Sequence, residues 1–525
     1  MGLYLNLGNE LLKQNMNSEI YIDKSMLISK TNEAIDTADS FWCVTRMRRS
    51  GKTMALSMLN AYYSKGCDSR NLFDNLKIAK DPSFEKHLNK HNVIWIDMGG
   101  AFCSSTDKSS FLPKLQRDII NDLREAFPSV DFEGVDENIA DTIAAIKNEA
   151  NENFIFLIDE WDIVFSERPD DKKLQEDYHY FLRSLFKNST IDGAIDFVYM
   201  TGILPINKGV TQSGLNNFNE FNMLDPEPLS EFFGFTQEEV DSLCDKFDMD
   251  KEEMRHWYNG YHYNSFDLYN PWSVDNAIQD KECDTYWNRT CSTKALTNQL
   301  NYNNGELKEA TIRLLAGEEV TFNSSLFDND LTKIHHKDAA LTVLVHFGYL
   351  AYNEDNHSCR IPNYEISQEF VKALKLLEWK EIENPITGSD RLIKETFLGN
   401  TDYINDVLDK NHKELASPFN KNKEDVLGII VEISYYNMIR DYDIRKEETN
   451  ILGRADIIYH PLKPGKPALI VELKVDDTPE NAIKQIEEKG YLRSLAGFKG
   501  KAYLLGISYD SKSLKHTSRI KVVEI

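Results

Sequence analysis

The chain has 525 residues, 41% of them hydrophobic and 28% charged, with a formal net charge of −25. At roughly 100–200 residues per domain, this length predicts three or four domains of ordinary globular composition. No apolar run approaches the roughly 18–20 residues of a membrane span, no signal peptide is evident, and the acidic balance disfavours non-specific binding to nucleic acid.

Cysteine and histidine usage argues against a structural metal or a disulfide frame. The seven cysteines are scattered and form no Cys-x-x-Cys pair, which fits reduced thiols in the cytoplasm. His335, His336 and His346 lack partners at the spacing of metal ligands, so we interpret them as structural. These features predict a cytoplasmic protein with no membrane partner.

The first chemical motif is Gly51-Lys52-Thr53. An apolar run typical of a short buried strand precedes it at residues 41–44, and residues 54–63 have the apolar face of a helix. Strand, loop, Gly-Lys-Thr and helix is the order of a phosphate-binding loop. Gly51 would let the backbone approach phosphate oxygens, Lys52 would reach the β- and γ-phosphates of ATP, and the Thr53 hydroxyl would ligate Mg²⁺.

This motif departs from the usual pattern at its start. The first glycine of a phosphate-binding loop would fall at Arg46. The alternative is a surface helix that happens to begin with Gly-Lys-Thr.

A second stretch, residues 153–162, favours the phosphate-binding interpretation. It is an apolar run that ends in Asp159 and Glu160, as expected of a central parallel strand with carboxylates at its carboxyl end. We expect Asp159 to hold Mg²⁺ and Glu160 to orient or deprotonate the attacking water. The alternative is an acidic loop after a core strand.

Alternating strands and helices continue to about residue 210 and predict a parallel three-layer α/β domain. Helices are expected at 111–127, 137–150 and 174–187, and further apolar strands at 93–97 and 197–202. Thr201 lies at the end of that strand. It is a candidate γ-phosphate sensor, and a plain strand cap is an equal alternative.

From about residue 215 to 385 the pattern changes to a helical lid and a small α+β module. Helices are predicted at 229–235 and 251–257, and Thr236 and Glu239 form a capping box. The aromatic turns at 258–263 and 269–273 could stack on bases, but such clusters are more often core.

A second chemical constellation lies near the C-terminus. Residues 450–460 and 468–475 predict a hairpin that places Asp456 and Glu472 on adjacent strands, with Lys474 on the same face as Glu472. Two facing carboxylates would bind a divalent cation, and the lysine would assist the attacking water. Glu424, on a predicted helix, would add a further metal ligand, and Gln485 would reach back from the next helix. The Glu-x-Lys triplet alone is weak, since exposed strands often carry it.

The last segment is locally basic on this acidic chain. A basic face is one interpretation, and an ordinary solvated surface is at least as good a one. The residues are Lys489, Arg493, Lys499, Lys501, Lys512, Lys515, Arg519 and Lys521.

With both constellations in view, the chain resembles AAA-ATPase-like proteins with a C-terminal PD-(D/E)XK nuclease-superfamily domain. The resemblance rests on motifs at residues 21–25, 45–53, 157–162, 201–202, 233–236, 258–261, 270–273, 361–363, 453–456 and 471–475. Arg46 in place of the first glycine is a trait of that family, whereas Met47 and Ser50 replace its usual Pro and Phe. The resemblance implies ATP binding and DNA cleavage, and residues 21–25 are expected to lie over the nucleotide site.

We therefore predict a P-loop α/β domain at 1–215, a helical and α+β middle region at 216–385, and a restriction-endonuclease-like α/β domain at 386–525. The expected function is Mg²⁺-dependent ATP hydrolysis coupled to a Mg²⁺-dependent nuclease acting on DNA. The alternative is a nucleotide-dependent regulatory or mobile-element protein whose C-terminal domain binds nucleic acid or a partner without cleaving it. Arg48 and Arg49 could contact phosphate, a neighbouring subunit or DNA, and the oligomeric state stays open.

Overall fold

The computed structural model describes residues 2–206, 215–263, 266–289, 293–301, 305–332, 334–415, 423–446, 457–495 and 497–525, without the side chains of 288 and 423–425. Two compact units divide the chain. The N-terminal unit comprises residues 1–249, 259–282 and 323–357, and the C-terminal unit comprises 250–258, 283–322 and 358–525. The three-part division expected from the sequence stays a prediction, because the middle region contributes segments to both units.

The N-terminal unit is built on a five-stranded parallel sheet of order β2-β3-β4-β1-β5. The strands are β1 (Phe41–Thr45), β2 (Asn92–Asp97), β3 (Phe154–Asp159), β4 (Ile195–Gly202) and β5 (Asn219–Phe221). All six residues of β3 are buried, which confirms the continuous apolar strand predicted for the centre of the sheet. In register, Asp97 lies beside Asp159 and Val44 beside Thr201, so the polar carboxyl ends of these strands share one edge.

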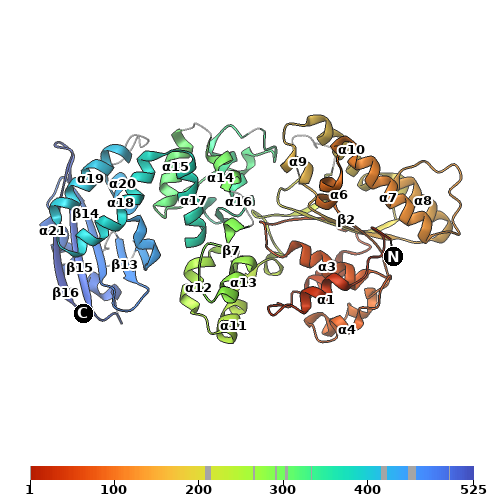
Figure 1. The fold of residues 1–525 in the computed structure, drawn as a ribbon, viewed down its shortest axis with the longest axis horizontal. Helices are drawn as coiled ribbons and strands as arrows, with labels where there is room; N and C mark the ends of the chain where they lie inside the picture. The colour runs from red at the N-terminus through yellow and green to blue at the C-terminus, as the bar shows by residue number, and fades with distance from the viewer. Residues whose placement is uncertain are drawn as a thin grey trace. The chain divides into compact units, whose positions relative to one another are not determined.

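Helices cover both faces of this sheet, as Figure 1 shows. Because successive strand residues point to opposite faces, Ile155 and Leu157 join one core while Phe156 and Ile158 join the other. One face carries α1 (Glu10–Met16), α2 (Leu27–Ala34) and α3 (Lys52–Tyr63); the other carries α7 (Phe111–Ala126), α8 (Ile139–Ala150) and α10 (Lys172–Phe186). The predicted three-layer α/β architecture is confirmed. Short helices of this part are α4 (Arg70–Phe73), η1 (Lys77–Lys80), α5 (Phe84–His87), α6 (Met98–Ser104), η2 (Lys108–Ser110), α9 (Ile163–Glu167) and η3 (Ser189–Ile191).

A small antiparallel sheet of order β6-β8-β7 completes the N-terminal unit. Its elements are η4 (Ser230–Phe232), β6 (Phe235–Thr236), α11 (Gln237–Phe247), β7 (Tyr261–Tyr263), β8 (Phe266–Tyr269), α13 (Pro271–Asp280), η6 (Ser324–Leu326), α16 (Lys337–His346) and β10 (Ala351–Asn353). The capping box of Thr236 and Glu239 is confirmed at the start of α11. The helix predicted at 229–235 is wrong, because Gly234 has a φ of 104°, which ends the turn and lets Phe235 pair with Tyr269.

The tyrosines of the two aromatic turns are core, as the sequence favoured, whereas Trp272 is only partly buried. Tyr258, Tyr261 and Tyr269 are buried, and His336 caps α16 by accepting the N–H of Ala339. None of the described helices combines the length and apolar character that a membrane-spanning helix needs.

The C-terminal unit contains a mixed sheet of order β12-β13-β14-β15-β16, in which β14 and β15 are parallel. Its core lies on two faces: Leu469 and Val471 pack with helices α18–α20, and Ile470 packs with α21. This α/β layering agrees with the predicted nuclease-like domain. The elements are α12 (Lys251–Tyr258), η5 (Trp287–Arg289), α14 (Thr293–Leu300), α15 (Gly305–Leu315), β9 (Val320–Thr321), β11 (Ser358–Arg360), α17 (Tyr364–Leu376), α18 (Lys380–Phe397), α19 (Thr401–Leu415), α20 (Lys423–Ser434), η7 (Tyr436–Arg440), β12 (Tyr442–Lys446), β13 (Ile457–Pro461), β14 (Ala468–Val475), α21 (Pro479–Glu488), η8 (Tyr491–Leu495), β15 (Lys501–Asp510) and β16 (Lys515–Glu524).

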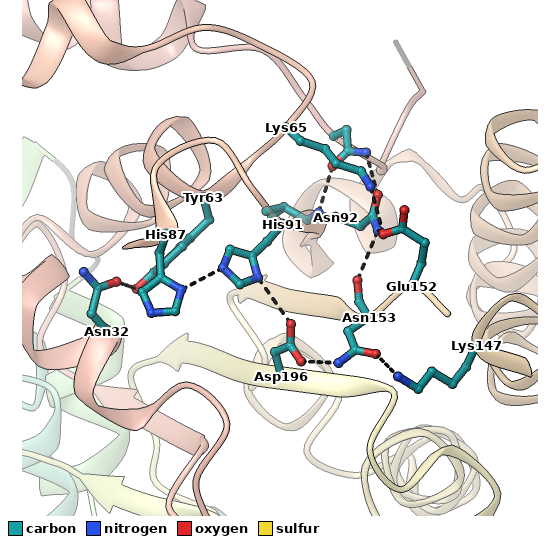
Figure 2. Close-up of polar contacts among 12 residues, drawn as sticks. Asn32, Tyr63, Lys65, His87, His91, Asn92, Lys147, Glu152, Asn153 and Asp196 are labelled. Atoms are coloured by element: carbon teal, nitrogen blue, oxygen red, sulfur yellow. Dashed lines mark hydrogen bonds and ion pairs between the residues drawn. The ribbon is translucent and has the colours of Figure 1, made fainter. Parts of the chain in front are cut away.

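A chain of polar side chains ties together the amino ends of β2, β3 and β4 (Figure 2). His87 Nδ1 lies 2.9 Å from His91 Nε2, and His91 Nδ1 lies 3.2 Å from an oxygen of Asp196. Asp196 also accepts a hydrogen bond from Asn153, whose own oxygen accepts from Lys147. Burial, followed by the charge of His91, lowers the pKa of His87 to about 4.

This network predicts acid sensitivity of the N-terminal unit. His87 is 4% exposed, and its pKa in the folded protein is about 4, below the ordinary value of 6.5. Between these two pH values the unfolded chain therefore binds a proton at His87 that the folded chain does not. The free energy of unfolding should therefore fall by about 2 kcal/mol from this residue alone between about pH 7 and pH 5. Calorimetry of His87→Gln should show a shallower pH dependence than that of the wild-type protein.

The C-terminal unit offers a second, independent test of the same idea. His412 has the same connectivity through His516 to Asp409, and burial also lowers its pKa to about 4. The variant His412→Gln should flatten the pH dependence of the other unit. A decline in His87→Gln as steep as in the wild type would contradict the assignment.

Candidate functional site

The loop between β1 and α3 carries the first predicted site. Gly51 has a φ of 96° and is the N-cap residue of α3, so the chain turns sharply where the helix begins. The first N–H groups of a helix have no acceptor within it and, with the helix dipole, attract anions. Lys52 Nζ donates to the carbonyl oxygens of Arg46 at 3.0 Å and Met47 at 2.8 Å, so its ammonium group lies against the loop.

Arg46 stands where a glycine usually begins such a loop, and its side chain has a structural role. It is 3% exposed, and its guanidinium donates to the carbonyl oxygens of Phe221 at 2.7 Å and Pro226 at 3.0 Å. The same group lies 5.1 Å from the ring centroid of Phe233. Arg46 thus joins the start of the loop to the end of β5 and to the segment that follows it.

Thr53 and Asp159 meet at the carboxyl edge of the sheet. The Thr53 hydroxyl donates to Asp159 Oδ2 at 2.7 Å. Burial raises the pKa of Asp159, and the Thr53 hydroxyl and the charge of Lys52 oppose that rise. Burial also lowers the pKa of Lys52 to about 8, against the charges of Asp159 and Asp162. A hydroxyl and a carboxylate oxygen side by side are hard oxygen ligands of the kind that Mg²⁺ prefers, so this pair fits the ion.

Glu160 and Asp97 extend the acidic edge. Glu160 is exposed and has a φ of 50°. A Cβ atom on Gly99 would lie 1.8 Å from Glu160 Oε2, so a larger residue at position 99 would displace the carboxylate from its present position. Partial desolvation of its carboxylate, and then the charges of Asp159 and Asp97, raise the pKa of Glu160.

Asp97 is a further carboxylate at this edge that was not among the predicted site residues. It accepts the N–H of Gly100 at 2.8 Å and caps α6. A signal was present, because Asp97 ends the apolar run 93–96 just as Asp159 ends its own run.

Asp162 belongs to the framework of the site. It is 4% exposed and accepts the N–H groups of Ile203 at 3.2 Å and Leu204 at 2.9 Å. Trp161 donates from its indole to the carbonyl oxygen of Leu204 at 3.1 Å. These bonds join the ends of β3 and β4.

Two further predicted positions are occupied by internal contacts. Thr201 is fully buried, and its hydroxyl donates to the carbonyl oxygen of Val44 at 2.8 Å, which fits the strand-cap alternative. In the segment 21–25, expected over the nucleotide, Lys24 forms an ion pair of 2.7 Å with Glu239 of the capping box.

The second predicted site lies on β14. Glu472 is 1% exposed, and Lys474 Nζ lies 3.0 Å from Glu472 Oε1, so the two side chains share a face as predicted. Asp456 and the Glu424 side chain lie outside the described residues. Gln485 donates to the hydroxyl of Tyr491 at 3.3 Å. Within the described ranges, no group of three or more His, Cys, Asp and Glu side chains is placed to hold a metal ion.

Several bases of the last segment are paired with acids. Lys515 lies 2.7 Å from Asp409 and Arg519 lies 2.8 Å from Glu480, while Lys521 pairs with Glu487. This arrangement favours the solvated-surface interpretation for these three bases.

Two family models match this chain, one over its N-terminal part and one over its C-terminal part. Residues 10–211 match a family described as a predicted AAA-ATPase, AAA-ATPase-like, and residues 423–519 match the PD-(D/E)XK nuclease superfamily. A relative described as an uncharacterized protein in the vnfD 5′ region of Azotobacter chroococcum mcd 1 is 23% identical over 514 residues, covering 94% of this chain and 95% of its own.

Two solved structures are also similar to parts of the chain. Cdc6p from Pyrobaculum aerophilum has a TM-score of 0.28 and 11% identity, covering 71% of this chain and 99% of its own. The ORC2 protein of Aeropyrum pernix, in ADPNP–ADP complexes, has a TM-score of 0.28 and 11% identity, covering 69% of this chain and 97% of its own.

The position of Asp162 yields a stability prediction. Asp162→Ala would leave one buried and one partly buried N–H group without their acceptor, which should lower the free energy of unfolding by about 2–4 kcal/mol. Asp162→Asn keeps an acceptor oxygen and should lose less than about 1 kcal/mol. Denaturant unfolding measures both; equal, small losses would show that Asp162 does not hold β3 to β4.

Proposed function

Because the chain carries an AAA-ATPase-like domain at 10–211 and a PD-(D/E)XK nuclease-superfamily domain at 423–519, we propose that it hydrolyses ATP with Mg²⁺ and cleaves DNA with a second metal site. The observation that carries the ATPase half is the 2.7 Å hydrogen bond between Thr53 and Asp159, beside the Lys52 ammonium group. It joins the two halves of the proposed Mg²⁺–phosphate site, which lie far apart in the sequence.

Each residue of the ATPase site has a role that follows from its position. The start of α3 and Lys52 bind the phosphate charge, and Gly51 gives the backbone room to approach it. Thr53 and Asp159 would hold the Mg²⁺ ion, which neutralises charge on the phosphates when bound. Thr201 is left out, because its hydroxyl is used within the sheet.

Glu160 is the proposed base for the attacking water. Its raised pKa brings it nearer to neutral pH, where a general base is most effective, and its carboxylate remains exposed at the edge of the sheet. Arg48 adds positive charge nearby, since its guanidinium lowers the pKa of both Glu160 and Lys52.

Two substitutions test the ATPase site. Lys52→Ala should abolish ATP turnover and weaken ATP binding, because it removes the cation that meets the phosphates. Glu160→Gln should retain ATP binding while turnover falls by about 10²–10⁴-fold, the usual contribution of a general base. Phosphate release and nucleotide titration measure the two quantities separately.

The control is Glu167→Gln, the same change at an exposed carboxylate at the end of α9. It should leave both quantities unchanged. Full turnover in Lys52→Ala would reject the phosphate-binding assignment.

The nuclease half rests on the buried carboxylate of Glu472 beside Lys474. Ile457, the first described residue of β13, pairs with Val471, the residue before Glu472. We propose that Asp456 and Glu472 share a Mg²⁺ ion, that Glu424 adds a ligand, and that Lys474 orients the attacking water.

Glu472→Ala should remove Mg²⁺-dependent nicking of DNA, because it deletes a ligand of the proposed ion. Nicking of supercoiled plasmid, with Mg²⁺ and with Mn²⁺, measures it. Glu488→Gln, at an exposed carboxylate of α21, is the control. Nicking that is indifferent to Glu472→Ala would reject this half of the proposal.

The ion pairs of the last segment favour one alternative, a switch that binds without cutting. A net charge of −25 and bases covered by Asp409 and Glu480 weaken attraction to DNA. DNA affinity titrated against salt, with cleavage assayed in parallel, separates the two functions. Binding without cleavage under every divalent metal would support the switch.

A further inference from the structure

The turn between β8 and α13 contacts the phosphate-binding loop through one side chain. Asn270 is 3% exposed, and its amide oxygen accepts the N–H of Trp272 at 3.0 Å, which makes it the N-cap of α13. Its amide nitrogen donates to the carbonyl oxygen of Arg48 at 3.1 Å. A serine or an aspartate would cap the helix equally well, so the cap alone does not explain an amide here.

Two neighbouring contacts hold the same stretch of loop. The Arg49 guanidinium lies 4.6 Å from the ring centroid of Trp272, and the N–H of Gly234 donates to the carbonyl oxygen of Ser50 at 3.0 Å. With Asn270 on Arg48, three consecutive loop residues are each held by the segment 234–272.

The backbone of the loop contains an unfavourable conformation that contacts from outside the loop must stabilise. Arg49 has a φ of 64°, a left-handed conformation that is unfavourable for a residue other than glycine and persists only where the surroundings impose it. The next residues are Ser50, Gly51 and Lys52, whose backbone begins α3. A change at Arg48–Ser50 would therefore reorient the amide groups proposed to bind phosphate.

We propose that Asn270 and Trp272 are positioning residues for the nucleotide, which hold residues 48–50 so that the start of α3 is aimed at the phosphates. This inference rests on the proposed ATP site and assigns a role to the turn 270–273. We call the contacts of Asn270 and Trp272 with residues 48 and 49 the clamp. Both residues of the clamp lie beyond residue 211, where the match to the ATPase family ends.

The test replaces the amide while keeping the cap. Asn270→Ser retains a capping oxygen, adds no charge and removes the donor to Arg48. We expect ATP affinity to fall about three- to tenfold, the equivalent of one hydrogen bond, while the midpoint of thermal unfolding falls by only a few degrees, so that the protein stays folded in the assay. Asn363→Ser, the same change at the N-cap of α17, is the matched control and should leave ATP affinity unchanged.

Two further variants separate the clamp from charge and from bulk packing. Asn270→Asp also keeps the cap, and it should weaken ATP at least as much as Asn270→Ser; weakening by the aspartate alone would mean that charge, not the clamp, is responsible, and would overturn the proposal. Trp272→Leu should weaken ATP binding, whereas Trp272→Phe keeps an aromatic face for Arg49 and should restore most of it.

Hydrogen exchange of the nucleotide-free protein gives a readout that does not need ATP. The peptide spanning 46–54 should exchange faster in Asn270→Ser than in the wild type and in Asn363→Ser. Unchanged exchange would overturn the clamp, and faster exchange with unchanged ATP affinity would overturn its role in nucleotide positioning. Wild-type protein that binds no ATP would instead reject the proposed function, while the exchange result would still decide whether the clamp exists.

Discussion

The proposed ATP site depends on the hydrogen bond from Thr53 to Asp159, which must cross the end of an intervening strand. In the order β3-β4-β1, strand β4 separates the two sides of the site. At the end of β4, the Thr201 hydroxyl donates to the carbonyl oxygen of Val44, and Gly202 has no side chain. A Cβ atom on Gly202 would lie 2.3 Å from Asp162 Oδ1, so the carboxylate that joins β3 to β4 needs a glycine there.

At the carboxyl edge of the sheet, acidic side chains at the ends of β2 and β3 face basic side chains of the phosphate-binding loop. Asp97 and Asp159 each raise the pKa of Glu160, since neighbouring negative charges disfavour ionisation, and Arg48 lowers it. Burial lowers the pKa of Lys52 to about 8, and the negative charge of Asp159 opposes that lowering by stabilising the ammonium form. Such a site has excess negative charge at the end of β2 and β3 and positive charge along the loop. A phosphate with a divalent cation matches that separation of charge better than either ion alone.

The sequence was sufficient for features that depend on local pattern. Strand β3, the Gly-Lys-Thr loop and the capping box of α11 were predicted because burial, turn geometry and capping leave short-range signatures. The sequence did not predict features that depend on contacts between residues far apart in the chain. Gly234 ends a predicted helix because β6 pairs with β8, and Asn270 reaches a loop residue more than two hundred positions earlier. Asp97 was within reach, because it shares the pattern that identified Asp159. The second carboxylate of the nuclease site, Asp456, lies outside the described residues, so that pairing stays a prediction.

The clamp also bears on how the two proposed activities could be coupled. The sheet β6-β8-β7 and α11 belong to the N-terminal unit, yet α12, which lies between α11 and β7 in sequence, belongs to the C-terminal unit. The segment that holds the phosphate-binding loop is therefore covalently continuous with the unit that carries Glu472. A ligand shifts an equilibrium only through contacts that differ between two states. On the proposal above, the contacts of Asn270 and Trp272 with residues 48–50 would differ between two such states wherever phosphate binding changes the conformation of the loop.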